Sequence, residues 1–186
     1  MVPLTELWLP IVLSAVIVFI ASSIIHMVLL IHKSDYKRLP NEEKLLEAMR
    51  SETLPTGLYH FPHAASMKEC GSPEMVEKFK KGPVGLLTVM PSGAPTMGKF
   101  LGLWFVYCLL VGFFTAYLAG RTLAPGTHYL AVFRVAGTAA FMSYGLASFV
   151  DSVWKGQPWS NTIKHMIDGL IYGLLTAGTF GWLWPR

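Results

Sequence analysis

Four long apolar stretches constrain this chain more than any other feature of its sequence. A transmembrane helix needs about 20 mostly apolar residues, and each stretch has about that length with at most one charged residue in its apolar part. A helix of this length in a soluble protein would carry a polar face. The sequence therefore predicts an all-α integral membrane protein, with a single membrane domain over residues 1–186. Its four transmembrane helices, which would form a four-helix bundle, are expected at 7–31, 100–120, 129–150 and 163–185.

The composition agrees with a membrane protein. Only 14% of the residues are charged, against about 25% in soluble domains. This argues against a soluble enzyme and against a nucleic-acid-binding protein, and the lipid bilayer is the first partner that the sequence predicts. The two cysteines, Cys70 and Cys108, are too few for a disulfide scaffold.

The distribution of basic residues predicts the orientation in the membrane. Ten of the fifteen lysines and arginines lie between the first two apolar stretches, at positions 33–99. Cytoplasmic loops are enriched in Lys and Arg, so this long connection is expected in the cytoplasm and both termini outside it. The sequence predicts an integral protein of the bacterial inner (plasma) membrane.

The cytoplasmic segment of about 65 residues, 32–98, should contain short helices but no large core of its own. Asn41 is placed to begin one helix that runs to about Ser51. Ser72 precedes Pro73 and begins a second, which Gly82 and the proline after it would end. Residues 84–90 fit either a β-strand or a stretch along the membrane surface.

A polar cluster is expected in the cytoplasmic half of the bundle. It comprises His26, His165 and Asp168, with Asp151 within reach at the end of the third helix. Polar groups inside a membrane are costly, so each is a candidate functional residue. A His–Asp pair in a low dielectric can relay protons, hold a metal or orient a ligand, or it can be purely structural. Arg134 is a charge in the outer leaflet that can pair with Glu6 or extend to the membrane surface.

Helical periodicity predicts which faces point toward the bundle axis, because lipid offers polar side chains no hydrogen bonds. Two glycine pairs at spacing four, Gly98/Gly102 and Gly169/Gly173, are expected to let helices approach closely. The polar stripes expected to face inward are His165, Asp168, Tyr172, Thr176 and Thr179 in the fourth helix; Arg134, Thr138, Phe141, Gly145, Ser148 and Ser152 in the third; Cys108, Gly112 and Thr115 in the second; and Ser22 and His26 in the first.

Motif searches identify no cofactor. His60, His63 and Cys70 form a loose group of soft metal ligands, with solvated loop residues as the alternative. His26 and His165 have similar predicted depths, which allows a bis-histidine haem, although four narrow helices leave little room for one. No phosphate-binding loop, dinucleotide fingerprint or nucleophile elbow occurs in the chain.

Two functions from different classes follow from these observations. The scarcity of catalytic groups favours a non-catalytic accessory or structural subunit of a larger membrane assembly, whose partners are other membrane subunits or further copies of the chain. The alternative is a small oligomeric transporter or membrane enzyme that uses the intramembrane His/Asp cluster.

Overall fold

The computed structural model describes all 186 residues, and the chain forms two compact units. One, here called the helical unit, consists of Met1–Tyr36 and Thr96–Arg186, and the other, the small unit, of Lys37–Pro95. Three helical segments are long and apolar enough to cross a membrane: Trp8–Val28, Met97–Thr122 and Tyr129–Lys155. These findings support the prediction of a helical membrane protein and three of its four predicted spans.

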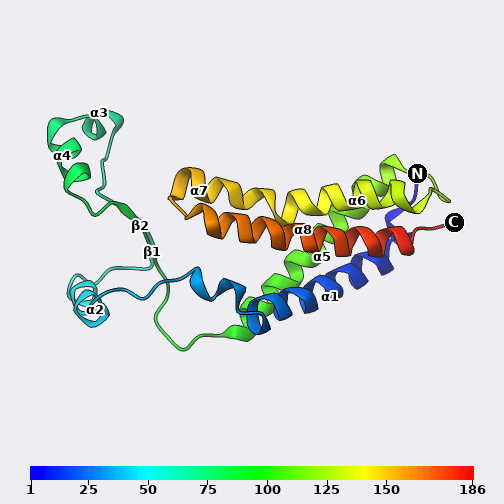
Figure 1. The fold of residues 1–186 in the computed structure, drawn as a ribbon, viewed down its shortest axis with the longest axis horizontal. Coiled ribbons are helices and arrows are strands. Elements are labelled where there is room, and N and C mark those ends of the chain that lie inside the picture. Colours follow the sequence, from blue (N-terminus) through cyan, green and yellow to red (C-terminus); the bar gives the residue numbers. More distant parts are fainter. The chain divides into compact units, whose positions relative to one another are not determined.

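The helical unit consists of long helices that run along one another (Figure 1). The most extensive contact is between α6 and α8, and α1 packs against both α5 and α8. The helices are α1 (Trp8–Ser23), continued by a π-helical turn (Ile24–Val28), α5 (Met97–Thr122), α6 (Tyr129–Tyr144), α7 (Phe149–Lys155) and α8 (Trp159–Trp182).

Both chain termini lie at the same end of the helical unit (Figure 1). The amide of Val2 donates a hydrogen bond to the Gly120 carbonyl at 2.8 Å, at the end of α5. The Trp184 indole donates to the Ala124 carbonyl at 3.0 Å. Val2 and Trp184 belong to a buried core that includes Phe180. The end of α1 and the beginning of α8 lie at the opposite end of the helical unit (Figure 1).

Close packing of α6 against α8 depends on glycine. A Cβ atom built on Gly169 would lie 2.4 Å from the Gly145 Cα, and one on Gly173 would lie 3.2 Å from the Phe141 amide nitrogen. The prediction for this pair is confirmed. The prediction for Gly98 and Gly102 is wrong, since a Cβ at either would meet nothing within 4 Å.

Four of the five residues in the predicted polar stripe of α8 are buried (Asp168, Tyr172, Thr176 and Thr179), whereas His165 is partly exposed. Cys108 and Thr115 of α5 are buried too. The predicted stripe of the third helix is wrong at its outer half, because Arg134 is exposed and Thr138 is exposed with it. The buried residues of α6 are small and apolar instead (Val132, Ala136 and Ala140), as a helix that packs this closely on α8 requires.

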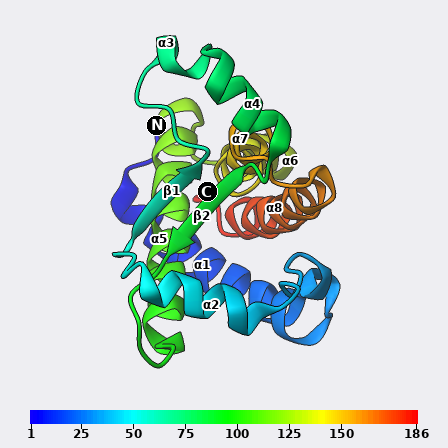
Figure 2. The same ribbon diagram turned by 90° about the vertical axis from the view of Figure 1, so that its left-hand side faces the viewer.

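The small unit combines three short helices with a β-hairpin (Figure 2). The strands are antiparallel, with Gly57 opposite Val89 and Phe61 opposite Gly85. Met75 is the only fully buried residue in the unit, as expected for a segment too short for a large core. Its elements are α2 (Glu42–Ser51), β1 (Gly57–Phe61), α3 (Met67–Cys70), α4 (Pro73–Lys81) and β2 (Gly85–Val89). Both predicted helices are confirmed, although Asn41 precedes the first in a left-handed conformation and its side chain forms no capping hydrogen bond. Gly85–Val89 form a strand within the predicted stretch 84–90, and the partner strand β1 is not predicted by the sequence.

We expect Ser72→Ala to loosen the first turn of α4. The Ser72 hydroxyl accepts a hydrogen bond from the Met75 amide at 3.2 Å, and Pro73 occupies the first helical position. Loss of such a cap costs about 1 kcal/mol, so exchange of the Met75 amide hydrogen should accelerate roughly fivefold. Ser51→Ala is the control, because Ser51 lies at the end of another helix, α2, where its hydroxyl donates a hydrogen bond to the Ala48 carbonyl and caps no helix start. Equal exchange in wild type and Ser72→Ala would contradict the assignment.

Candidate functional site: a histidine and aspartate cluster

The cluster begins where α1 changes its winding. The last turn, Ile24–Val28, is π-helical and carries His26, and such turns are frequent at functional sites. Leu30 then adopts a left-handed conformation with φ 51°, which costs a residue other than glycine roughly 1–2 kcal/mol. This reversal starts the short 3₁₀ helix Ile31–Ser34, which carries His32.

Two side chains of α8 fix this reversed segment in place. The Lys164 ammonium donates three hydrogen bonds, to the Ile31 carbonyl at 2.9 Å, to the Ser34 hydroxyl at 2.9 Å and to Asp35 Oδ1 at 2.6 Å. Asn161 Nδ2 donates to the Asp35 carbonyl at 3.2 Å. All three donors of the lysine are therefore used, and His32 is held beside α8.

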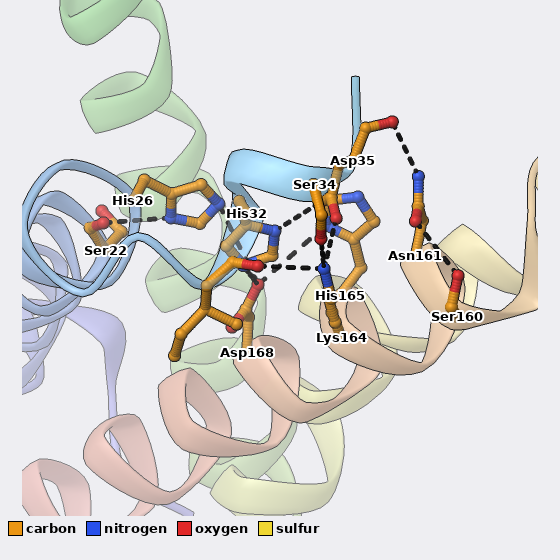
Figure 3. Close-up of polar contacts among 11 residues, drawn as sticks. Ser22, His26, His32, Ser34, Asp35, Ser160, Asn161, Lys164, His165 and Asp168 are labelled. Carbon is orange, nitrogen blue, oxygen red and sulfur yellow. Dashed lines mark hydrogen bonds and ion pairs between the residues drawn. The ribbon is translucent and has the colours of Figure 1, made fainter. Parts of the chain in front are cut away.

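Imidazole nitrogens surround one carboxylate oxygen of Asp168 (Figure 3). His32 Nε2 lies 2.9 Å from Asp168 Oδ2, and His26 Nε2 lies 4.0 Å from the same oxygen. His165 Nδ1 lies 4.0 Å away on a third side. Asp168 is 9% exposed and His32 10%, whereas the other two imidazoles are about two-fifths exposed. The site is buried at its centre and accessible at its edge.

The two imidazoles nearest the end of α1 are oriented through their other nitrogen. His26 Nδ1 lies 3.0 Å from the Ser22 carbonyl oxygen, so that nitrogen must carry the proton and donate. His32 Nδ1 lies 2.6 Å from Asp35 Oδ2. In both rings an oxygen acceptor engages Nδ1 and leaves Nε2 toward Asp168, which is the arrangement that orients histidine ligands in metal sites.

Three of the four buried side-chain atoms without a hydrogen-bond partner belong to this site. They are His32 Nε2, Asp168 Oδ2 and the Tyr172 hydroxyl. Buried polar atoms in proteins are nearly always paired. His32 Nε2 and Asp168 Oδ2 are close enough for an ion pair when His32 is protonated, but they form no hydrogen bond with each other or with another group. An arrangement of this kind fits a group that binds between them.

The charges of the cluster are unequally balanced. Burial opposes ionisation of Asp35, but hydrogen bonds from Lys164 and His32 outweigh it and hold the pKa of this carboxyl below its usual value. Asp35 is thus an anion paired with an ammonium at 2.6 Å. Asp168 has only imidazoles around its carboxyl group, and no lysine or arginine pairs with it.

A cavity of about 750 Å³ adjoins the cluster within the helical unit. Small-molecule sites typically have volumes of about 300–1,000 Å³. The cavity lies among α1, α5, α6 and α8, and His26, His165 and Asp168 form part of its polar wall. Asp151, predicted to reach the cluster, also lines the cavity but pairs with Lys155 at 2.7 Å.

The remaining predicted residues lie apart from the cluster. Arg134 is exposed and forms no ion pair with Glu6. His60 lies in β1, where its Nδ1 contacts the Pro62 carbonyl at 3.0 Å. His60, His63 and Cys70 are not among the residues whose ligand atoms gather closely enough to share an ion. Cys70 and Cys108 are both free, as expected.

The imidazole stack bears on the haem alternative. The ring of His32 stacks on His26 with centroids 4.3 Å apart and on His165 with centroids 5.4 Å apart. His32 therefore fills the space between the two histidines that a haem would need. The cluster as observed fits a single small ion better than a macrocycle.

Three residues of the cluster were missed in the sequence: His32, Asp35 and Lys164. His32 and Asp35 fall in the expected cytoplasmic segment, and Lys164 falls near the start of the expected fourth helix, where the sequence indicates no role for it. One signal was present, because His32–Asp35 and His165–Asp168 share the spacing H-x2-D. The two copies pair across the site, with His32 between both carboxylates.

Comparison with known proteins adds no further information to this geometry. No protein-family model, no curated protein and no solved structure matches the chain.

Proposed function

We propose that this chain is an integral membrane metalloprotein in which His26, His32 and Asp168 bind one divalent transition-metal ion. The observation that carries the proposal is the contact between two buried atoms, His32 Nε2 and Asp168 Oδ2, which lie 2.9 Å apart although neither forms a hydrogen bond. Two ligand atoms of one zinc ion lie about 3.4 Å apart, given bonds of about 2.1 Å at the tetrahedral angle. The observed separations of 2.9 and 4.0 Å lie on either side of this value.

The donor set selects the class of metal. Two imidazoles and one carboxylate suit zinc, iron(II), nickel or copper(II) rather than magnesium or calcium. The His26 ring has to tilt out of its stack on His32 to share an ion with it, and its exposure of about two-fifths allows this movement. Three protein ligands beside an open cavity match catalytic metal sites, which keep one coordination position free.

A second grouping of ligand atoms, His32 with Asp35 and His165, is the competing location for the ion. We favour the first grouping because Asp35 is already saturated. Its Oδ1 accepts from Lys164 and its Oδ2 contacts His32 Nδ1. Asp35 then acts behind the ligand shell, where it orients His32, and Asp168, which no lysine or arginine contacts, provides the carboxylate ligand.

We further infer that α8 is a fourth membrane span, with the metal site in the cytoplasmic half. Apart from Ser160 in its first turn, the exposed residues of α8 are apolar, among them Ile167, Leu174 and Trp182, and its buried residues include polar ones. This is the reverse of a soluble helix and suits a lipid surface. The clustering of Lys and Arg between α1 and α5 supports a cytoplasmic loop and extracytoplasmic termini.

Metal content tests the proposal. We expect the full-length protein, purified in mild detergent and reconstituted with zinc, to bind one ion per chain by elemental analysis. Asp168→Asn should weaken zinc binding by at least about 100-fold, and Asp35→Asn by about 10- to 100-fold because it acts through His32. If the ion occupied the competing group, Asp35→Asn would be the more damaging of the two.

The matched control is the double variant His60→Ala/His63→Ala. It removes two histidines of the small unit and leaves the helical unit intact. Unchanged zinc binding in this variant, with loss in Asp168→Asn, supports the intramembrane site. The opposite result would move the metal to the predicted loop ligands, and unchanged binding in both would refute the proposal. Circular dichroism and size-exclusion chromatography would establish that each variant is folded.

The accessory-subunit hypothesis stays a prediction. It requires stoichiometric partner chains when the tagged protein is purified from its own host in mild detergent. Metal binding and partnership are compatible, so the two measurements are independent.

A further inference from the structure

The cavity beside the metal site has a polar end and apolar walls. At the polar end lie His26 and Asp168 of the site, with Tyr172 one helical turn after Asp168. Met27, Met97 and Leu101 form part of the apolar wall. A cavity with this division favours a molecule with one polar head and an apolar chain.

Tyr172 supplies a second unsatisfied group at the polar end. Its side chain is buried, it lines the cavity, and its hydroxyl has no hydrogen-bond partner. Buried tyrosine hydroxyls usually find a partner. The hydroxyl can donate one hydrogen bond to an oxygen atom, and an ion at the proposed site would accept an anionic oxygen, so both groups favour a ligand with oxygen atoms.

The surroundings restrict what can reach this cavity. It lies among α1, α5, α6 and α8, and three of the helical segments concerned are long and apolar enough to cross a membrane. The Trp104 indole donates to the Ser22 hydroxyl at 2.8 Å, and the Tyr107 hydroxyl donates to the Ser143 carbonyl at 2.6 Å. These polar wall groups are already paired, as are Ser148 and Asp151, whereas Tyr172 and Asp168 at the metal end have side-chain oxygens without a hydrogen bond.

We propose that the cavity binds a single-chain lipid with a carboxylate head. The head oxygens contact the metal ion and the Tyr172 hydroxyl, and the hydrocarbon chain lies against Met97 and Leu101. This inference rests on the proposed metal site for part of its head-group recognition. The apolar wall and Tyr172 do not depend on the metal.

Photo-crosslinking tests the inference. The zinc-loaded protein in detergent is irradiated with a diazirine analogue of palmitic acid, and the labelled peptides are identified by mass spectrometry. We expect saturable labelling of the residues that line the cavity, with competition by palmitate and none by its methyl ester, which lacks the free carboxylate. Leu101→Trp should abolish saturable labelling because it fills the cavity. Leu103→Trp is the matched control, since Leu103 is exposed on the same helix and does not line the cavity.

Tyr172→Phe separates head-group recognition from folding. Its hydroxyl has no partner in the protein, so its removal should leave the melting temperature unchanged or higher. Binding of the probe should weaken by about three- to tenfold, the value of one hydrogen bond. A merely structural tyrosine would leave labelling unchanged.

The outcomes distinguish the lipid inference from the metal proposal. Zinc binding without saturable labelling, or with labelling that Leu101→Trp leaves intact, overturns the lipid inference and leaves the metal site. Saturable labelling that Leu101→Trp and Tyr172→Phe both reduce, in a protein that binds no zinc, supports the lipid site and refutes the metal.

Discussion

Replacing Gly169 with alanine should destabilise the helical unit by at least about 2 kcal/mol. The new Cβ would lie 2.4 Å from the Gly145 Cα, 2.5 Å from its nitrogen and 2.8 Å from the Tyr144 carbonyl carbon. All three are backbone atoms, so no side chain can move aside and α6 has to separate from α8. The free energy of unfolding, measured by titrating detergent-solubilised protein with sodium dodecyl sulfate, would report the loss.

A graded series provides the control for this prediction. At Gly173 the nearest atoms would be about 3.2 Å away, so Gly173→Ala should cost less than Gly169→Ala. At Gly102 nothing lies within 4 Å, and Gly102→Ala should stabilise its helix by about 0.5–1 kcal/mol because alanine loses less backbone entropy on folding. Equal effects at Gly169 and Gly102 would show that α6 and α8 do not pack as described.

Gly169→Ala should also disturb the metal site. Asp168 precedes Gly169 on α8, and displacement of this turn from α6 changes the position of the carboxylate relative to His32. Metal-binding positions tolerate displacements of about half an ångström. We therefore expect weaker zinc binding together with the lower stability, whereas Gly102→Ala should lower neither the zinc affinity nor the stability.

The sequence contained most of what defines the spans and the inward face of α8. Residue hydropathy and length identified three spans, and the period of the polar residues correctly predicted the burial of Asp168, Tyr172 and Thr176. The period predicts burial on α8 because a helix repeats the same face every three to four residues and lipid excludes unpaired polar groups along its whole length. On α6 the same reasoning failed at Arg134, because close packing on α8 demands small residues and leaves the long side chain outside.

The geometry of the cluster was less predictable. The sequence predicts His26, His165 and Asp168 together, but it places His32, which lies at their centre, in the loop after a span that ends at residue 31. Its position depends on a π-helical turn and on Leu30 in a left-handed conformation. Neither has a compositional signature, since leucine normally avoids that conformation. The hydrogen bonds of Lys164 to Ile31 and Asp35 hold the segment that carries His32 beside α8. Contacts between residues so far apart in the sequence cannot be predicted from local sequence patterns.

Lys164→Met should be among the most damaging single substitutions near the site, with a loss of about 3 kcal/mol or more. The lysine is 23% exposed and its partner Asp35 only 5%, and removing one member of a buried ion pair leaves the other charge uncompensated, which costs about 3–5 kcal/mol. The Ile31 carbonyl and the Ser34 hydroxyl lose their donor at the same time.

Lys155→Met is the matched control for this prediction. Lys155 pairs with Asp151 at 2.7 Å, a similar distance, but the two side chains are 58% and 35% exposed. Exposed ion pairs contribute about 0–1 kcal/mol, so this variant should unfold almost like the wild type. A similar loss in both variants would mean that Asp35 is not buried as described.

The double variant Lys164→Met/Asp35→Asn tests whether the pair has a role beyond stability. It removes the uncompensated charge, so part of the stability lost in Lys164→Met should return, with a coupling free energy of about 1–3 kcal/mol in a double-mutant cycle. Zinc binding should not return with it, because Asp35→Asn removes the carboxylate that His32 Nδ1 contacts. Recovery of both would mean that Lys164 and Asp35 only hold the segment in place. Recovery of stability alone would assign Asp35 to the orientation of a metal ligand.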